Sequence, residues 1–173
     1  MKKEKLYPFL KWCVYALLLL LFYTLQTTPG LFQIAHAKPV LIAALAVCVA
    51  MYENVIPAAC FSMAAGFLWD ISSDKLFGFN ALIFLVCGMF ISLICIYYLH
   101  TKLVNALLFC LVAMLLQSGM DYLFYYAMWG YSSAWLAYVG RILPTLAYTV
   151  VATIPIFFLV RSVERRLSLM ERV

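Results

Sequence analysis

The sequence predicts an all-α integral membrane protein that folds as a six-helix polytopic bundle. Of its 173 residues, 68% are hydrophobic and only 11% are charged, and the mean hydropathy is +1.03. A soluble domain is about half apolar and about a quarter charged, so this composition excludes a soluble globule. It also excludes intrinsic disorder, which requires low hydrophobicity and high charge. The apolar residues form runs close to the roughly 20 residues that a spanning helix needs.

The first predicted span covers 8–25, after a basic start and before the turn signal Thr27-Thr28-Pro29-Gly30. This apolar run is longer than the roughly 7–15 residues of a signal-peptide core. The small-residue pattern Ala35-His36-Ala37, which resembles a cleavage site, lies well beyond the end of the run. We therefore expect an uncleaved first helix.

The apolar stretch that follows is too long for one span and carries Glu53-Asn54 near its middle. A charged side chain near the bilayer centre is costly. The sequence therefore predicts two short helices, over 39–52 and 55–69, joined by a turn at Glu53-Asn54. These helices either cross the membrane fully or form a re-entrant hairpin buried in protein, and the sequence leaves both arrangements open.

Three further spans are predicted over 77–99, 103–125 and 141–160. In this layout nine of the 12 Lys and Arg residues lie on the side of the two chain ends. Basic loops and tails stay in the cytoplasm, so we expect both termini to be cytoplasmic. The whole chain, 1–173, then forms a single transmembrane domain. Because no soluble module lies between the basic tails, we do not expect nucleic-acid binding.

The sequence contains no pattern that indicates catalysis. It has two His residues, six Cys residues that never form a C-x-x-C pair, and no nucleophile elbow, zinc-protease motif or phosphate-binding loop. The cysteines all lie in apolar stretches, where they act as small hydrophobic residues. We therefore expect no enzyme activity, no cofactor and no metal site.

A stripe of small residues ends in a carboxylate: Ala58, Ser62, Gly66 and Asp70 are spaced by four and share one helix face. Small residues at this spacing allow a neighbouring helix to approach closely. The stripe is either an internal packing face or a lateral docking surface on which Asp70 anchors a partner.

A second carboxylate, Asp121, lies inside the fifth predicted span, and Arg141 opens the sixth. An ionisable group in hydrocarbon needs a partner, so we predict that these two side chains pair. Tyr and Trp residues crowd the segment between them, as expected of a belt at the membrane interface.

Short motifs over much of the chain resemble the rod shape-determining protein MreD family. They include Lys38-Pro39 at the start of the second span, Gly66-Phe67-Leu68-Trp69-Asp70, and Leu76-Phe77-Gly78-Phe79-Asn80. Asp121 is similar to an acidic residue of that family, and the segment from Pro155 to Arg161 is similar to its closing span and basic tail.

The resemblance implies a non-enzymatic scaffold in the bacterial inner membrane that supports lateral wall synthesis and rod shape. The partners it implies are an MreC-type bitopic protein, the MreB-type filament and the RodA-transpeptidase complex, besides the lipid bilayer. The family fold is also similar to the S component of energy-coupling-factor transporters. This similarity implies an alternative function, a solute-binding subunit of a vitamin transporter, with Asn80, Asn105, Gln117 and Asp121 as candidate pocket residues.

Overall fold

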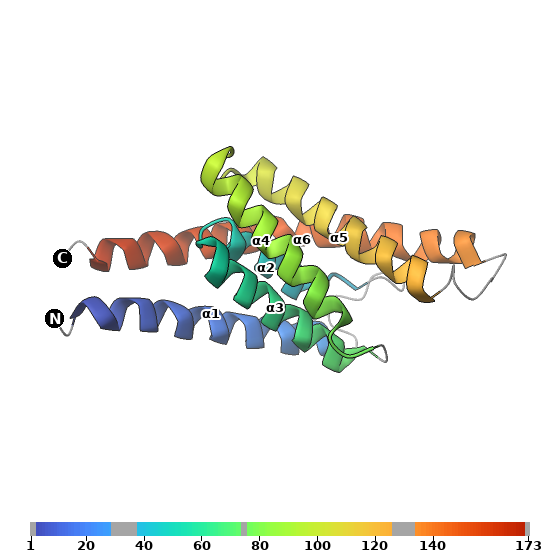
Figure 1. Ribbon diagram of the computed structural model, residues 1–173, viewed down its shortest axis with the longest axis horizontal. Helices are drawn as coiled ribbons and strands as arrows, with labels where there is room; N and C mark the ends of the chain where they lie inside the picture. Colours follow the sequence, from blue (N-terminus) through green and yellow to red (C-terminus); the bar gives the residue numbers. More distant parts are fainter. Residues whose placement is uncertain (1–2, 29–37, 74–75, 126–133, 172–173) are drawn as a thin grey trace.

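The computed structural model describes residues 3–28, 38–73, 76–125 and 134–171, which form six α-helices and no strand (Figure 1). The helices are α1 (Lys3–Thr27), α2 (Leu41–Ala50), α3 (Val55–Ser72), α4 (Phe79–Tyr97), α5 (Leu103–Tyr125) and α6 (Ala134–Glu171). All except α2 are long and apolar enough to cross a membrane. The predicted fold class, an all-α multi-pass membrane protein with six helices, is confirmed.

The beginning of α1 and the end of α6 lie side by side at one end of the bundle (Figure 1). We call this the terminal end, and the opposite end the distal end. The turn between α2 and α3 and the turn between α4 and α5 both face the terminal end. The junction between α3 and α4 lies at the distal end, as does the start of α2.

Helix α2 lies in the centre of the bundle, and all ten of its residues are buried. It packs against each of the other five helices. Ten residues span about 15 Å at 1.5 Å per residue, which is half of a hydrocarbon core about 30 Å thick. The predicted span over 39–52 therefore contains a shorter helix than expected, and the two arrangements predicted for it, a full crossing and a re-entrant hairpin, both stay predictions.

The start of α2 is tied to two other helices by side chains. The Thr149 hydroxyl accepts a hydrogen bond of 3.0 Å from the backbone N–H of Val40, and Gln26 Oε1 accepts one of 3.2 Å from that of Ile42. The first N–H groups of a helix have no partner within it. Here α1 and α6 supply the partners, and this fixes the position of α2 in the core.

The predicted break between the second and third helices is confirmed. Helix α2 ends at Ala50 and α3 begins at Val55, with Glu53 and Asn54 in the turn between them. The backbone carbonyl of Asn54 accepts the first hydrogen bond of α3, from the N–H of Ala58. The turn places the Glu53 carboxylate at the terminal end, away from the apolar centre of the bundle.

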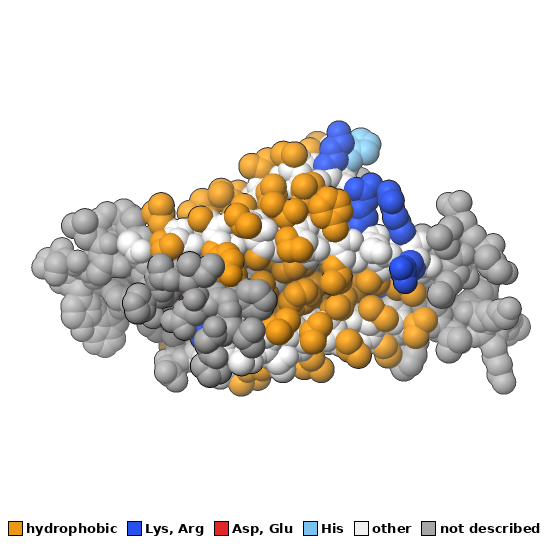
Figure 2. Space-filling model, turned by 180° about the vertical axis from the view of Figure 1, so that it is seen from behind, with side chains coloured by type: hydrophobic (Ala, Val, Ile, Leu, Met, Phe, Trp, Pro, Cys, Tyr) orange, Lys and Arg blue, Asp and Glu red, His pale blue; other side chains and the backbone are white. Residues whose placement is uncertain are grey.

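The first and last helices are longer than the predicted spans over 8–25 and 141–160. Both extend past the α2–α3 turn at the terminal end (Figure 1). Helix α6 continues through its basic tail and contains Pro144 and Pro155. The lateral surface is largely apolar over its described residues (Figure 2), as expected for a bundle surrounded by lipid.

Candidate functional site

Asp70 caps the start of α4 from the last turn of α3. Its Oδ2 accepts backbone hydrogen bonds from Gly78 (2.9 Å) and Ala81 (3.3 Å). Its Oδ1 accepts hydrogen bonds from the backbone N–H (3.2 Å) and the side-chain amide (2.9 Å) of Asn80. The carboxylate is only 3% exposed. A negative charge at a helix N-terminus satisfies its free N–H groups and complements the helix dipole.

Gly78 makes this cap possible because its backbone has φ +93°, in the left-handed region. Residues with a Cβ adopt this conformation only at a cost. Gly78 belongs to the motif Leu76-Phe77-Gly78-Phe79-Asn80 that carries the family resemblance, and the structure shows its physical role. It turns the chain so that its N–H and those of the next residues point at Asp70.

The cap continues into a buried network with α5. Gln117 Nε2 donates to Asn80 Oδ1 (3.0 Å) and to Asp121 Oδ2 (3.2 Å). We call Asp70, Asn80, Gln117 and Asp121 the distal network; each is at most 7% exposed. Asp121 is thus joined to Asp70 through two amides. The side chain of Arg141 lies outside the described residues, so its pairing with Asp121 stays a prediction.

The small-residue stripe faces α4 of the same chain. Ala58, Ser62 and Gly66 are buried. A Cβ at Gly66 would lie 2.4 Å from Ala81 Cα, and one at Gly88 would lie 2.2 Å from Ser62 Oγ. The two backbones therefore approach as closely as small-residue packing allows. The geometry supports the internal packing face, and we place any partner surface elsewhere on the chain.

Gly88 is the residue on the facing helix that the sequence analysis missed. A signal was present, because Ala81, Gly88 and Ser92 recur on α4 at intervals of seven and four residues. These intervals place small residues on one helix face, as in the stripe on α3.

Lys38 and Pro39 meet the end of α3 at a distal hollow of about 580 Å³. The hollow is also lined by Trp69 and Ser72 of α3, and by residues at the end of α1. Two motifs that are 30 residues apart in the sequence, Lys38-Pro39 and the segment ending at Asp70, thus lie around one polar depression. We call it the distal hollow.

A second cluster of polar side chains lies at the terminal end, and the sequence did not predict it. Lys11 Nζ lies 2.7 Å from Glu53 Oε1 and 2.8 Å from Glu164 Oε1, and these side chains are only 10–16% exposed. The buried Tyr15 hydroxyl donates to the Glu164 carboxylate. We call these four residues the terminal cluster. It joins α1, the α2–α3 turn and α6.

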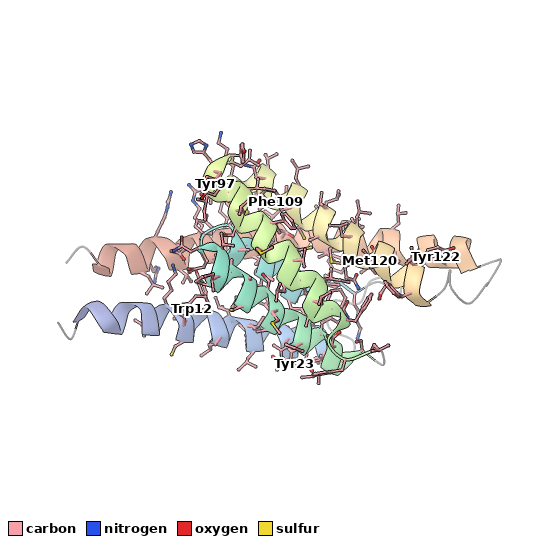
Figure 3. All side chains as sticks on the ribbon, in the orientation of Figure 1. Trp12, Tyr23, Tyr97, Phe109, Met120 and Tyr122 are labelled. Carbon is pink, nitrogen blue, oxygen red and sulfur yellow. The ribbon has the colours of Figure 1, made fainter. Side chains whose placement is uncertain are left out.

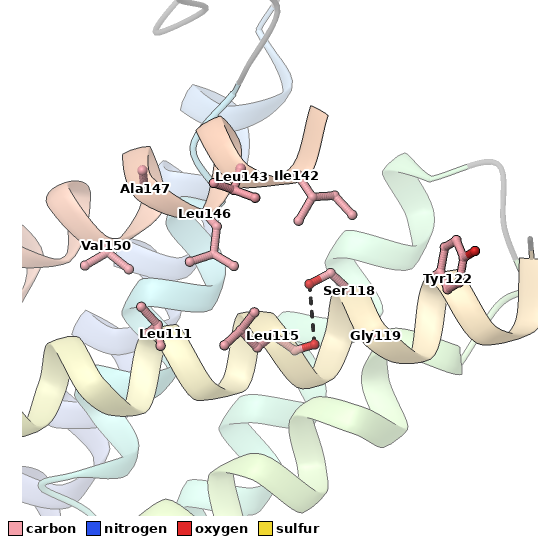
Figure 4. Close-up of a pocket in the computed structure, with 10 residues that line it drawn as sticks. All are labelled: Leu111, Leu115, Ser118, Gly119, Tyr122, Ile142, Leu143, Leu146, Ala147 and Val150. Carbon is pink, nitrogen blue, oxygen red and sulfur yellow. Dashed lines mark hydrogen bonds between the residues drawn. The ribbon is translucent and has the colours of Figure 1, made fainter. Parts of the chain in front are cut away.

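An open groove lies between α5 and α6 and has a volume of about 720 Å³ (Figure 4). Its walls are almost entirely apolar, with Leu111 and Leu115 on α5 facing Leu146 and Val150 on α6. A Cβ at Gly119 would meet no atom within 4 Å, so the groove is open there.

The polar side chains expected to form a solute pocket bond to protein groups instead. Asn80 and Gln117 bond to each other within the distal network, and Asn105 Nδ2 donates to the backbone carbonyl of His100 at the terminal end (2.8 Å). Within the described residues, no group of three or more His, Cys, Asp or Glu side chains could hold a metal ion. The geometry supports structural roles for these polar groups.

Comparison with known proteins identifies the family. Neither the curated proteins nor the solved structures gave a match to this chain. The model of one protein family, described as rod shape-determining protein MreD, matches residues 6–166, which include every described helix except the first residues of α1 and the last of α6. Because this match covers far more than half of the 173 residues, the chain belongs to the rod shape-determining protein MreD family.

Proposed function

We propose that this protein is a non-enzymatic scaffold of the bacterial elongation machinery, located in the inner membrane. It binds an MreC-type bitopic protein and links it to the MreB-type filament and the RodA-transpeptidase complex. The observation that carries the proposal is the family match over residues 6–166, which supports a role in rod shape determination.

The interior of the bundle supports a scaffold rather than a moving carrier. Three features hold the distal half in one arrangement. The backbones of α3 and α4 are in contact, Asp70 accepts four hydrogen bonds, and α2 is enclosed by the other helices. Interiors packed in this way respond little to small forces. A rigid body with exposed grooves suits a protein that positions others.

The groove between α5 and α6 is the surface best suited to the single helix of the bitopic partner. In lipid, helices associate through close packing, because hydrocarbon leaves little hydrophobic drive between them. The open site at Gly119 and the small side chain of Ala147 on the facing wall allow a close approach.

Co-purification in mild detergent tests this proposal. Leu115→Trp fills the groove, whereas Leu108→Trp is a matched control on the same helix outside the groove. The two leucines are similarly exposed, at 51% and 56%. We expect Leu115→Trp to lose most of the MreC-type partner and Leu108→Trp to retain it. Equal recovery with both variants would place the partner elsewhere.

The same preparation separates the proposal from the solute-binding alternative. A scaffold should copurify with wall-synthesis proteins. A stoichiometric vitamin bound to the purified chain, together with a transport ATPase in place of those proteins, would support the alternative and contradict the scaffold.

A further inference from the structure

A polar hollow lies at the terminal end, where α4 finishes. It has a volume of about 360 Å³ and is lined by the segment 95–101, which includes Tyr97, Tyr98, His100 and Thr101. Both tyrosines are strongly exposed, at 72% and 81%. Tyrosine prefers the headgroup level of a bilayer because it has an apolar ring and a polar tip. The hollow thus lies where lipid headgroups surround the bundle.

Positive charge flanks this hollow. Lys102 directly follows its last residue and is exposed. Arg161 of α6 is half-buried, and Arg165 is exposed one turn further along that helix. Figure 2 shows Lys, Arg and His side chains gathered at this end of the apolar surface.

Tyr52 connects the hollow to α6. The Tyr52 ring lies 6.3 Å from the ring of Phe157 between centroids, and Arg161 follows Phe157 by about one turn of α6. The charge of Arg161 and the side chain of Thr101, which lines the hollow, both act on the Tyr52 hydroxyl.

The nearby carboxylates cancel only part of this charge. Glu53 and Glu164 share the single ammonium group of Lys11 in the terminal cluster, so these three side chains together are singly negative. Lys102 and Arg161 carry two positive charges, so the balance beside the hollow stays positive and complements an anion.

An apolar groove is lined by the part of α4 that precedes the hollow. It lies between α4 and α5, has a volume of about 310 Å³, and is lined from Val86 to Ile94 on α4 and from Phe109 to Leu116 on α5. Ile94 directly precedes the first residue of the hollow. The two helices diverge from their turn (Figure 1), and Tyr97 and Phe109 mark the two parts of this surface (Figure 3).

We propose that the hollow and the neighbouring groove together bind one anionic phospholipid, with its phosphate in the hollow beside Lys102 and Arg161 and one acyl chain in the groove between α4 and α5. The polar hollow with its neighbouring cations suits the charged headgroup of a phospholipid, and the apolar groove suits an acyl chain. A single Lys or Arg near an anionic lipid surface changes the affinity about five-fold.

Native mass spectrometry of the delipidated full-length protein tests the proposal. The probes are phosphatidylglycerol and phosphatidylcholine with identical acyl chains. We expect phosphatidylglycerol to bind more tightly, and Lys102→Gln to weaken it about five-fold, with a smaller loss for phosphatidylcholine because its choline cation offsets the charge of its phosphate. Lys38→Gln is the control, because it removes a lysine from the distal end. Thermal unfolding of each variant checks that it remains folded.

Two further measurements test the groove and the source of the phosphate. Phe109→Trp places a reporter in the groove, and phosphatidylglycerol with brominated chains should quench it beyond the quenching seen in wild type. Glycerol phosphate, which has no acyl chains, should form no adduct. The proposal is overturned by equal binding of the two lipids, by an equal loss with Lys38→Gln, by an unquenched reporter or by tight binding of glycerol phosphate.

Discussion

The distal network and the terminal cluster both bury carboxylates, but they neutralise them in different ways. At the distal end Asp70 is surrounded by backbone and amide N–H groups, and the helices that meet there, α3, α4 and α5, follow one another in the chain. At the terminal end one ammonium group serves two carboxylates, and it joins α1 to α6 across nearly the whole sequence. The distal network closes local hairpins, whereas the terminal cluster joins the two ends of the chain.

This difference predicts that the distal half depends on geometry and the terminal half on charge. Backbone N–H donors remain after any side-chain substitution except one to proline, and salt screens them little when they are buried. Charged side chains in a partly exposed cluster can be removed by mutation and weakened by salt. Mutations at the two ends should therefore differ in size and in salt dependence.

Gly66→Leu should have the largest effect. Even a Cβ at this position would lie 2.4 Å from Ala81 Cα, so α3 and α4 must separate and the cap at Asp70 must open. We expect a loss of at least about 3 kcal/mol, the upper range of overpacking costs, measured by thermal unfolding in detergent. Gly119→Leu is the matched control, since a Cβ there meets no atom. If both variants unfold alike, close packing does not hold the distal half together.

Asp70→Ala should cost about 3 kcal/mol. The substitution leaves the N–H groups of Gly78, Asn80 and Ala81 without an acceptor in a buried position. Asp70→Glu retains the charge but misplaces it, so we expect an intermediate loss. Chemical denaturation monitored by Trp fluorescence gives the free energies. An unchanged midpoint for Asp70→Ala would show that the cap contributes nothing to stability.

Lys11→Met should cost about 2 kcal/mol at neutral pH. Removing one member of a fully buried ion pair costs about 3–5 kcal/mol, but carboxylates left together can take up protons and recover part of this. The double variant Lys11→Met, Glu164→Gln should regain stability because only one carboxylate remains. Raising the salt concentration should weaken wild type more than Lys11→Met. A double variant less stable than the single one would contradict the proposed charge balance.

Tyr15→Phe should have the smallest effect, about 1 kcal/mol. The substitution removes only the hydroxyl that donates to Glu164 and keeps the ring, which packs 5.8 Å from Trp12 and 5.9 Å from Phe61 between ring centroids. Tyr15→Leu, which loses the ring contacts as well, should cost more. Equal losses would assign the stability to the hydroxyl bond alone and none of it to the ring contacts.

Local features of the sequence predicted one feature at each end of the bundle. The cost of a charge near the membrane centre located the break at Glu53-Asn54, at the terminal end, and the four-residue spacing identified the face that carries Gly66 and Asp70, at the distal end. Both inferences use residues within a few turns of each other. The sequence could not decide whether the stripe is an internal packing face or a docking surface for a partner, because that depends on where α4 lies in the fold.

The terminal cluster could not be predicted in the same way. Lys11 and Glu164 are separated by more than 150 residues, and one sequence does not report which distant helices are neighbours. Lys11 was therefore interpreted only as a cytoplasmic positive charge. The isolated Glu53 was a usable signal, because a carboxylate inside an apolar run requires a cation from somewhere in the fold.

The enclosure of α2 has a consequence for how the protein is made. Two N–H groups at its beginning bond to Gln26 of α1 and to Thr149 of α6, and α6 leaves the ribosome after the other five described helices. During synthesis the second helix must wait, incompletely surrounded, until α6 has been made. A nascent chain that stops before the sixth helix would thus carry an exposed core, and membrane quality-control proteases would be expected to degrade it.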